Sequence, residues 1–532
     1  MLFMMNRTAT PAAIDIRREY EELQRAHEEL KCRHALEIAE LEEQVRLLRS
    51  ILYGKSSEKK SFDGPTAEQP FLPFDEVEAS AGALPQTTEE ANAPDDRPRK
   101  KPGRRPLSAH LERVDKKYDL PDDQKFAPCG CPLICIGTEV TERLNIIPAK
   151  IQVVRETRYK YAPGCDCEIP ENAPGEVRIA PLPPQIIPQG IVTPGLLAHV
   201  VTAKYVDAIP LYRQEQQFMR LGLDITRGTL ASWVRQTAQA CVPIFDLISR
   251  EVRAGPVIHM DETPVQVLRE PGRANTTKSY MWVCRGGQPG RPAVIFRYYP
   301  TRSGRVADEM LADYRGYLHT DGYIGYETVG LRDGIRHLGC WAHVRRKFVE
   351  VEKGTKGSLK AGVAKEVLDL IGKLYLIEDQ ARDNGLSPDE VVALREKESR
   401  PKLEEIKRIL DRYAGMTPPK SLLGKAITYA LNLWPRLTIF PENANLRLDN
   451  NPAENAIRPF AVGRKNWLFS GSPRGADASA TLYSIIETAK ANNIEPYTYL
   501  RLLFMEVPKA KSEAELHALL PQYLDRARLE IA

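Results

Sequence analysis

The chain has 532 residues, 42% of them hydrophobic, which is enough to form sizeable buried cores. This length predicts about three or four domains, since one domain usually takes roughly 100–200 residues. The 75 basic and 71 acidic residues leave a net charge of only +4, which alone does not indicate a nucleic-acid-binding protein. No run of about 18 apolar residues occurs and the first residues do not resemble a secretory signal, so we expect neither a membrane span nor secretion. The nine cysteines then favour reduced thiols or metal ligands in a cytoplasmic protein over disulfides.

The small net charge conceals two segments of opposite charge. Residues 61–96 contain nine acids and neither Lys nor Arg, and their Pro-, Ala-, Glu- and Thr-rich composition predicts a disordered acidic linker over 56–96. Residues 97–117 contain nine bases and two acids, which indicates a basic arm over 97–120. The arm is either a solvated tail or a contact with DNA phosphates. Its candidate DNA-binding residues are Arg99, Lys100, Lys101, Arg104 and Arg105.

Residues 14–55 are expected to form one long helix, because neither Gly nor Pro interrupts them before Gly54. Apolar residues recur there at alternating steps of four and three, a pattern typical of a coiled coil. The main seam contains Ile16, Tyr20, Leu23, His27, Leu30 and His34, and Leu41 and Leu48 keep its register. We therefore expect a homo-oligomer that assembles through this helix; the alternative is a helix packed on its own domain.

Residues 121–180 contain five of the nine cysteines and are expected to form a small zinc-binding module. Two C-x-C pairs flank a segment of alternating character at 150–161 that resembles a β-hairpin. Four thiolates suit a tetrahedral zinc ion, which would stabilise a module with little core of its own. Cys135 can replace Cys131 in this set, and unliganded buried thiols are the alternative. The candidate ligands are Cys129, Cys131, Cys165 and Cys167.

Residues 190–250 are predicted to be helical. A predicted helix over 211–220 is followed by a turn that contains Gly222 and by a second helix that Thr226 opens. This is the order of a helix-turn-helix. Many such corners make no contact with DNA, so the pattern alone is a weak indication. If it does bind DNA, Arg227 and Arg235 are the candidate contacts.

From residue 256 the pattern changes to strands. Short apolar runs separated by Gly and Pro begin at Val257, Tyr280, Ala293, Tyr317 and Arg336, and a helical pattern lies between the third and the fourth. This order predicts a mixed sheet flanked by helices. The chain is then almost entirely helical over 341–438, and again from about 473 to 505.

Two acids follow the first and fourth of these strands. Asp261 is expected at the end of the first strand and Asp321 at the end of the fourth. In the predicted order these strands are neighbours, so the two carboxylates would face each other. Paired carboxylates repel unless a cation lies between them, and magnesium prefers such ligands. The alternative is a pair of acids in turns at strand ends.

Glu454 is the third candidate acid. Asn451 is suited to cap a helix, Pro452 to its first position and Glu454 to its third, which is a capping box. The same geometry would also fix Glu454 as a third ligand. Three acids with two magnesium ions would form a phosphoryl-transfer site. The basic and aromatic residues nearby suit a DNA strand; they are Arg447, Arg458, Arg464, Lys465, Arg474, Trp467 and Phe469.

Several longer motifs occur together in this chain. They are HMDETPVQV at 259–267, YLHTDGY at 317–323, GCWAHVRRKF at 339–348 and NNPAENAIRPFAVGRKNWLFSGS at 450–472, with further matches at 52–59, 103–114, 142–161, 209–234 and 485–500. The sequence resembles the DDE transposases of the insertion-sequence 66 family, of the transposase C type, over nearly its whole length. One departure is in the cysteine pairs, which are usually C-x-x-C in this family.

The resemblance implies an RNase-H-like catalytic core over 251–483, with a helical insertion at about 350–445 and a C-terminal helical segment over 484–532. Asp261, Asp321 and Glu454 would be its catalytic residues and would hold two Mg²⁺ or Mn²⁺ ions. It also implies a helical N-terminal DNA-binding region and a zinc-binding domain. Cys340 and His343 match a family motif, and we expect them to make a structural contact.

The implied reaction is cleavage at the inverted repeats of a mobile element and transfer of the freed 3′ ends into target DNA. Such a protein would act on double-stranded DNA in the bacterial cytoplasm, in association with the nucleoid. Accessory proteins encoded by the same element are possible further partners. Two alternatives are a DNA-binding accessory protein without catalysis and a structure-selective nuclease of the same fold.

The basic arm generates the first test. We expect Arg104→Ala combined with Arg105→Ala to weaken DNA binding and to lower the slope of log affinity against log salt by about two, since each phosphate contact contributes about 0.9. Fluorescence anisotropy of a labelled duplex over a salt series measures both quantities. An unchanged affinity and slope would remove these two arginines from the DNA interface.

Overall fold

The computed structural model describes residues 11–53, 151–161, 178–179, 181–355 and 359–531. The acidic linker, the basic arm and the four candidate zinc ligands lie outside these residues. The chain divides into two compact units, residues 67–159 and the rest, and every described helix and strand belongs to the second of these. Among the described residues no helix is both long and apolar enough to cross a bilayer.

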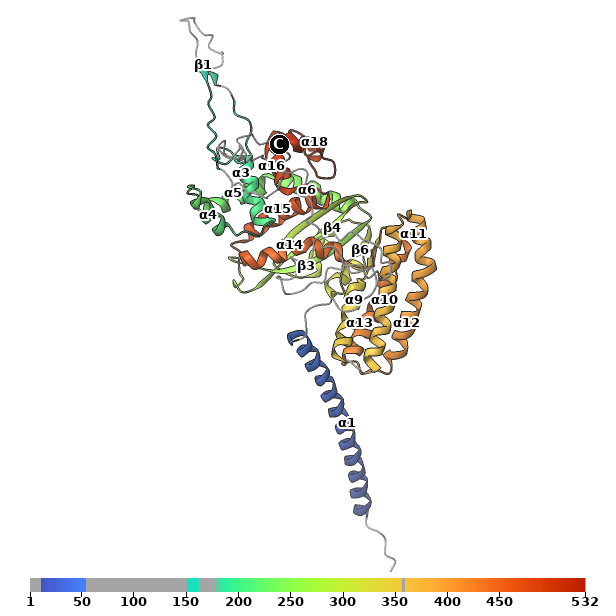
Figure 1. Ribbon diagram of the computed structural model, residues 1–532. Coiled ribbons are helices and arrows are strands. Elements are labelled where there is room, and N and C mark those ends of the chain that lie inside the picture. Colours follow the sequence, from blue (N-terminus) through green and yellow to red (C-terminus); the bar gives the residue numbers. More distant parts are fainter. Residues whose placement is uncertain (1–10, 54–150, 162–177, 180, 356–358, 532) are drawn as a thin grey trace, which may run out of the picture. The chain divides into compact units, whose positions relative to one another are not determined.

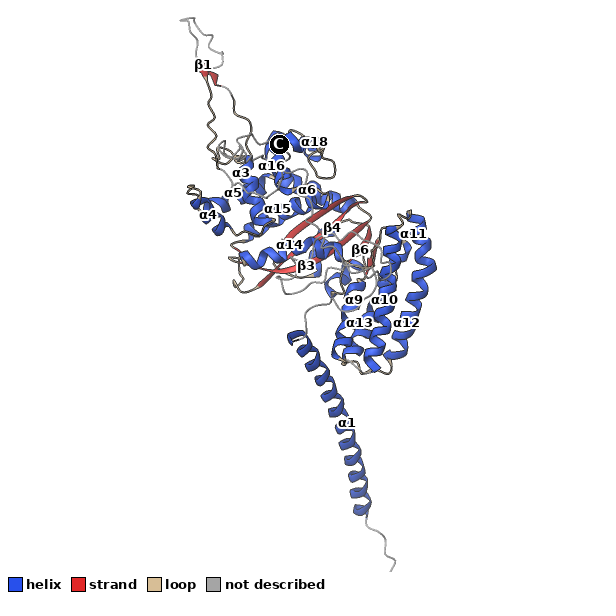
Figure 2. Ribbon diagram, viewed as in Figure 1, coloured by secondary structure: helices blue, strands red, loops and turns tan. Residues whose placement is uncertain are grey.

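A mixed sheet lies at the centre of this larger unit (Figures 1 and 2). Its strands run in the order β5-β4-β3-β6-β7, antiparallel from β5 to β3 and parallel from β3 to β7. The predicted first and fourth strands are therefore neighbours. The strands are β3 (Val257–Val267), β4 (Lys278–Gln288), β5 (Arg291–Tyr299), β6 (Gly316–His319), β7 (Ile335–Leu338) and the short β8 (Phe469–Ser470), which pairs with the second half of β3.

Strand β3 is longer than the sequence predicts. Asp261 lies in its middle rather than at its end, because β4 continues to pair with β3 as far as Gln266. On the other edge, β6 pairs with β3 only as far as His259. The prediction of a strand end at Asp261 is therefore wrong for β3 as a whole, although Asp261 does lie just beyond its parallel pairing.

Helices α6 (Val242–Ala254), α14 (Asn451–Trp467) and α15 (Pro473–Ala491) pack on strands β3, β4 and β5 (Figure 1). α15 is bonded directly to β5: the Phe296 N–H donates to Ser484 Oγ at 2.7 Å and the Val294 N–H to Thr488 Oγ1 at 3.0 Å. These bonds satisfy backbone groups of an edge strand. The predicted boundary between 251–483 and 484–532 falls inside this continuous helix, because its buried face belongs to the sheet.

In chain order, further helices come before, between and after the strands of the sheet. Before it come α3 (Pro194–Tyr205), α4 (Leu211–Arg220) and α5 (Arg227–Ala240); within it lie α7 (Gly304–Leu311), η2 (Ile324–Tyr326) and α8 (Glu327–Gly330); after it come α16 (Pro496–Glu506), η5 (Val507–Lys509), α17 (Glu513–His517) and α18 (Ala527–Ile531). Thr226 caps α5 as predicted, since its hydroxyl accepts from the Thr229 N–H. The two-residue strands β1 (Lys160–Tyr161) and β2 (Arg178–Ile179) pair antiparallel.

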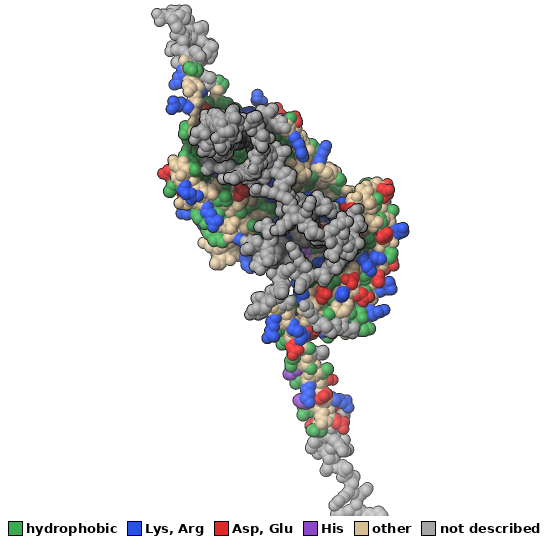
Figure 3. Space-filling view, in the orientation of Figure 1, with side chains coloured by type: hydrophobic (Ala, Val, Ile, Leu, Met, Phe, Trp, Pro, Cys, Tyr) green, Lys and Arg blue, Asp and Glu red, His purple; other side chains and the backbone are tan. Residues whose placement is uncertain are grey.

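A helical block separates β7 from α14 in the sequence. It contains α9 (Trp341–Gly354), α10 (Leu359–Asp383), α11 (Pro388–Leu394), the π-helical turn η3 (Arg395–Ser399), α12 (Arg400–Ala414), α13 (Leu422–Leu437) and η4 (Phe440–Glu442). Its apolar core is continuous with Val257 of β3 and Leu338 of β7. On the face drawn in Figure 3, acidic and basic side chains are interspersed over the block. The block also contains the exposed ion pairs Lys407–Asp411 and Arg400–Glu396.

Arg395 joins this block to the segment that leads into α14. Its side chain is almost completely buried and pairs with both carboxylate oxygens of Glu378, at 2.8 and 2.6 Å. The same guanidinium donates to the carbonyls of Phe440, Asn443 and Leu446 at 2.8 to 2.9 Å. One charged group therefore determines the path of the chain just before Glu454.

Helix α1 (Pro11–Tyr53) is described where the sequence predicts a helix over 14–55. Near its end Arg46 Nε donates to the Gly354 carbonyl and Lys360 pairs with Glu43, so this end contacts the helical block. An apolar row nevertheless remains open, with exposed fractions between 45% and 68%. It contains Tyr20, Leu23, Leu30, Ile38, Leu41, Val45 and Leu48.

We expect Arg395→Met to lower the free energy of unfolding by about 3 kcal/mol, because it leaves Glu378 and three carbonyls without their partner. Urea unfolding followed by circular dichroism measures this change. Arg400→Met is the matched control: the Arg400 side chain is 44% exposed and, among the described residues, its ion pair is with Glu396, so its loss should cost under about 0.5 kcal/mol. Equal effects of the two substitutions would contradict this role of Arg395.

Candidate active site

Strands β3 and β6 place Asp261 and Asp321 at equivalent positions. His259 is directly opposite His319 in the parallel register, and their ring centroids are 5.0 Å apart. Each aspartate follows its histidine by two residues. Alternation along β3 directs Asp261 to the face that carries His259, whereas Asp321 lies just beyond the end of β6. Both carboxylates are anchored, because Asp261 Oδ1 accepts from the Glu262 N–H at 2.8 Å and Asp321 Oδ1 from the Tyr323 N–H at 2.9 Å.

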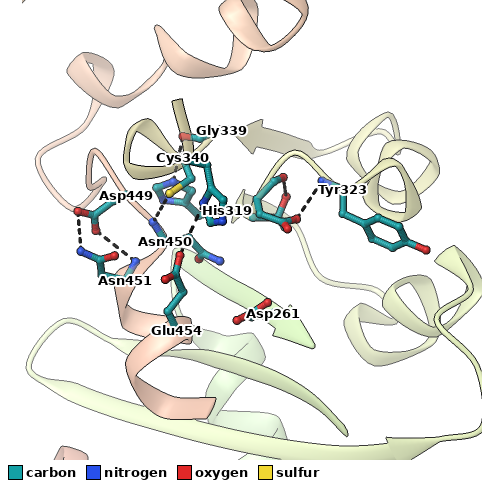
Figure 4. Close-up of polar contacts among 12 residues, drawn as sticks. Asp261, His319, Tyr323, Gly339, Cys340, Asp449, Asn450, Asn451 and Glu454 are labelled. Atoms are coloured by element: carbon teal, nitrogen blue, oxygen red, sulfur yellow. Dashed lines mark hydrogen bonds and ion pairs between the residues drawn. The ribbon is translucent and has the colours of Figure 1, made fainter. Parts of the chain in front are cut away.

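Glu454 reaches the same region from the first turn of α14 (Figure 4). The predicted capping box is wrong: α14 begins at Asn451, and the residue before it, Asn450, makes no side-chain cap. The side chain of Asn450 is occupied elsewhere, since its Nδ2 donates to the Met260 carbonyl at 2.7 Å and its Oδ1 lies 3.1 Å from His259 Nδ1. The start of α14 is thus fixed to β3 by tertiary bonds.

The three carboxyl groups influence one another electrostatically. Burial raises the pKa of Asp261 well above its usual value, and the charges of Glu262, Asp321 and Glu454 raise it further. Burial likewise raises the pKa of Glu454, with Asp321 adding to the effect. Negative charge is therefore concentrated in a poorly hydrated region, which a divalent cation with oxygen ligands would relieve.

The acid next to Asp261 has a different role. Glu262 is buried, and alternation along β3 directs it away from Asp261. It accepts from Arg302 Nε at 2.6 Å and from the Tyr326 hydroxyl, and the Arg302 guanidinium lies 3.6 Å from the centre of the Tyr323 ring. Because these partners already satisfy its carboxylate, Glu262 supports the strand. Its sequence neighbours, Asp261 and Thr263, contain no signal for this role.

The structure brings Cys340 and His343 to Glu454. The three side chains offer ligand atoms that all lie within 4.8 Å of one another, and His343 Nδ1 is 3.6 Å from Glu454 Oε1. Figure 4 shows the Glu454 carboxylate directed from α14 toward Cys340, with Asp261 on β3. The spacing C-x-x-H in the sequence was the available signal for this contact.

Three further histidines line the parallel strands. His259, His319 and His337 are all buried, and burial lowers the pKa of His259 and of His337 to about 3 and that of His319 well below its usual value. His337 Nε2 is 2.8 Å from Thr320 Oγ1, and His319 Nε2 is 3.1 Å from the Gly339 carbonyl. These rings are therefore neutral at physiological pH.

The candidate DNA-binding residues fall into different environments. Arg458 is half-buried one turn after Glu454, and Lys465 is exposed. Arg464 instead donates to Thr263 Oγ1 at 3.0 Å and to the Pro264 carbonyl, which holds α14 on β3. Arg227 and Arg235 are exposed on α5. A basic residue that the sequence reading missed is Arg346 of α9, which is exposed and whose charge lowers the pKa of Glu454.

Three family models, which match separate segments, together cover most of this chain. Residues 189–478, which contain the whole site, match the model described as "Transposase IS66 family". Residues 40–115 match the model "Transposase C of IS166 homeodomain", and residues 484–522 match the model "IS66 C-terminal element".

Similar proteins occur in Sinorhizobium fredii, each described there as uncharacterized. Protein y4jD is 32% identical over 499 residues, covering 91% of this chain and 94% of its own. Protein y4qI is 30% identical over 502 residues, covering 91% of this chain and 88% of its own. The similarity therefore extends over nearly the full length of both relatives.

The neutral histidines make stability dependent on pH. His337 has a pKa of about 3 when folded and about 6.5 when unfolded, so between these values only the unfolded chain binds the proton, and acid favours unfolding. As the pH is lowered from 6 to 4, we expect the free energy of unfolding to fall more steeply in the wild type than in His337→Asn. The two slopes should differ by about 1 kcal/mol per pH unit. Urea unfolding at several pH values measures both slopes.

The carboxyl groups with raised pKa act in the opposite direction, because the folded chain binds their protons more readily. They are the same in wild type and His337→Asn, so the difference between the two slopes isolates the histidine. Identical slopes would show that His337 is not held neutral in the fold.

Proposed function

Since the chain belongs to the IS66 transposase family, we propose that it is a DDE-type enzyme that cleaves DNA at the ends of a mobile element and joins them to target DNA. The observation that carries the proposal is the matched placement of Asp261 and Asp321 beyond the pairing of β3 with β6, with Glu454 beside them. The sheet order, three antiparallel strands followed by two parallel ones, supports an RNase-H-like core.

The residues present fit divalent cations. Burial, and after it the neighbouring acids, raise the pKa of Asp261 and of Glu454. The buried Oε1 of Glu454 has no hydrogen-bond partner within the described part of the chain. We propose that Asp261 and Asp321 hold one of two Mg²⁺ or Mn²⁺ ions and Glu454 the other. Such ions, when bound, would stabilise negative charge on the attacking and leaving oxygens of an in-line displacement at phosphorus.

The chain itself contributes position and charge. Backbone N–H groups hold the Asp261 and Asp321 carboxylates, so these need little reorganisation during the reaction. The bonds of Asn450 hold the start of α14, the helix that carries Glu454. Arg346 and Arg458 lie close enough to influence the charge of Glu454. We propose that they attract the DNA phosphates that flank the reacting bond.

Other parts of the chain would serve binding and assembly. The exposed apolar row of α1, in which Ile38, Leu41, Val45 and Leu48 follow steps of three and four, supports self-association through this helix. We also propose that α4 and α5 contact double-stranded DNA through Arg227 and Arg235. The basic arm and the zinc-binding module remain proposals on the sequence alone.

A strand-transfer assay with labelled element ends tests the function. We expect Asp321→Asn to lower strand transfer at least about 100-fold, because removing a metal ligand costs several kcal/mol of transition-state stabilisation. Asp313→Asn is the matched control: Asp313 is an exposed acid in the turn before β6, so its activity should stay within about twofold of wild type.

The outcomes separate the alternatives. Strand transfer by Asp321→Asn equal to that of the control would contradict catalysis by the three acids. Binding of the element ends without any cleavage by the wild type, with Mg²⁺ or Mn²⁺ supplied, would favour an accessory DNA-binding protein. Cleavage without joining would favour a structure-selective nuclease.

A further inference from the structure

Cys340, His343 and Glu454 form a compact group of mixed ligand chemistry at the edge of the proposed catalytic centre. Cys340 directly precedes α9, His343 lies in its first turn, and Glu454 approaches from α14. One ligand atom from each residue lies within 4.8 Å of the other two. Cys340 and His343 are only three positions apart at the start of α9, and the third residue comes from an element more than a hundred residues away.

Two atoms of this group lack the partners that buried polar atoms normally have. Within the described part of the chain, neither His343 Nδ1 nor Glu454 Oε1 has a hydrogen-bond partner, although both atoms are buried. They are 3.6 Å apart, which is too long for a hydrogen bond between them. Buried nitrogen and oxygen atoms left in this way are costly, and one cation bound by both would satisfy them.

The separation between His343 and Glu454 suits ligands of one small metal ion, and Cys340 lies within reach of both. Bonds of about 2.0–2.3 Å from a tetrahedral ion to sulfur, nitrogen and oxygen place the ligand atoms roughly 3.3–3.8 Å apart. The observed 3.6 Å between His343 Nδ1 and Glu454 Oε1 lies in that range. Three protein ligands leave the fourth position open to water or to a substrate oxygen.

The donor set selects the class of metal. Thiolate and imidazole ligands favour zinc-like divalent ions, whereas magnesium prefers oxygen ligands alone. We propose that Cys340, His343 and Glu454 bind one zinc-class divalent cation, with Glu454 shared between this ion and the magnesium site. The catalytic place of this ion rests on the proposed function, whereas its binding does not. Binding displaces the Cys340 thiol proton to solvent.

The surroundings hold the ligands in place. Cys340 is fully buried and its Sγ accepts from the Asn450 N–H at 3.3 Å. The side chain of Asn450 is in turn bonded to His259 and to the Met260 carbonyl. Groups that orient a ligand in this way typically raise metal affinity.

Cobalt titration of the full chain tests the site, with Cys129, Cys131, Cys135, Cys165 and Cys167 all replaced by Ser so that the predicted zinc-binding module cannot contribute. We expect one equivalent of Co²⁺ to bind and to produce the near-ultraviolet absorption band of a thiolate–cobalt bond. Cys340→Ser in this background should abolish the band. Cys32→Ser, which removes an exposed cysteine of α1, should leave it unchanged.

His343→Gln keeps the test decisive if Cys340→Ser fails to fold, since His343 is only partly buried. We expect it to keep the circular dichroism spectrum and to weaken Co²⁺ binding at least about 10-fold. Absence of the band in the parent protein, an equal band in Cys340→Ser, or unchanged affinity in His343→Gln would each overturn the proposal. A wild-type chain without strand transfer whose cysteine-substituted parent still shows the band would refute the proposed function and leave the metal site standing.

Discussion

The side chain and backbone of Asn450 join the three elements on which the site depends. Its amide bonds to the Met260 carbonyl and to His259 of β3, and its N–H donates to the sulfur of Cys340 at the start of α9. The residue itself immediately precedes α14. Asp261, His343 and Glu454 therefore lie on elements that share one hydrogen-bonded junction, and a shift of any one element would break bonds to the others.

This junction requires a defined approach of the chain to α14, and the helical block provides it. Arg395 donates to three carbonyls of the segment from Phe440 to Leu446. Further along the same segment, the Leu448 carbonyl accepts from the backbone N–H of Trp341, and Asn450 follows. The block also shares its apolar core with β3 and β7. It is therefore part of what positions Glu454, although the sequence reading treats it as an insertion.

Electrostatics then sets what the junction can hold. Asp261 and Glu454 have raised pKa values because burial and neighbouring acids disfavour their charged forms. The nearby histidines cannot compensate, since burial keeps them neutral. Burial also raises the pKa of Glu262, but this carboxylate has a counter-charge in Arg302. A carboxylate group without such a partner fits a cation, in agreement with the function proposed from the family.

Alternation of apolar residues was enough to predict the strands and which of them are neighbours, because these features depend on local periodicity and strand order. The motifs around Asp261, Asp321 and Glu454 indicated the three acids, whose catalytic role stays a prediction. The sequence could not show that β3 continues beyond Asp261, since that depends on its antiparallel partner. Nor could it show that Asn450 bonds to β3 instead of capping α14, or that Glu454 meets Cys340 and His343. These contacts join residues about 110 to 190 positions apart, and only tertiary packing decides between them and the local alternatives.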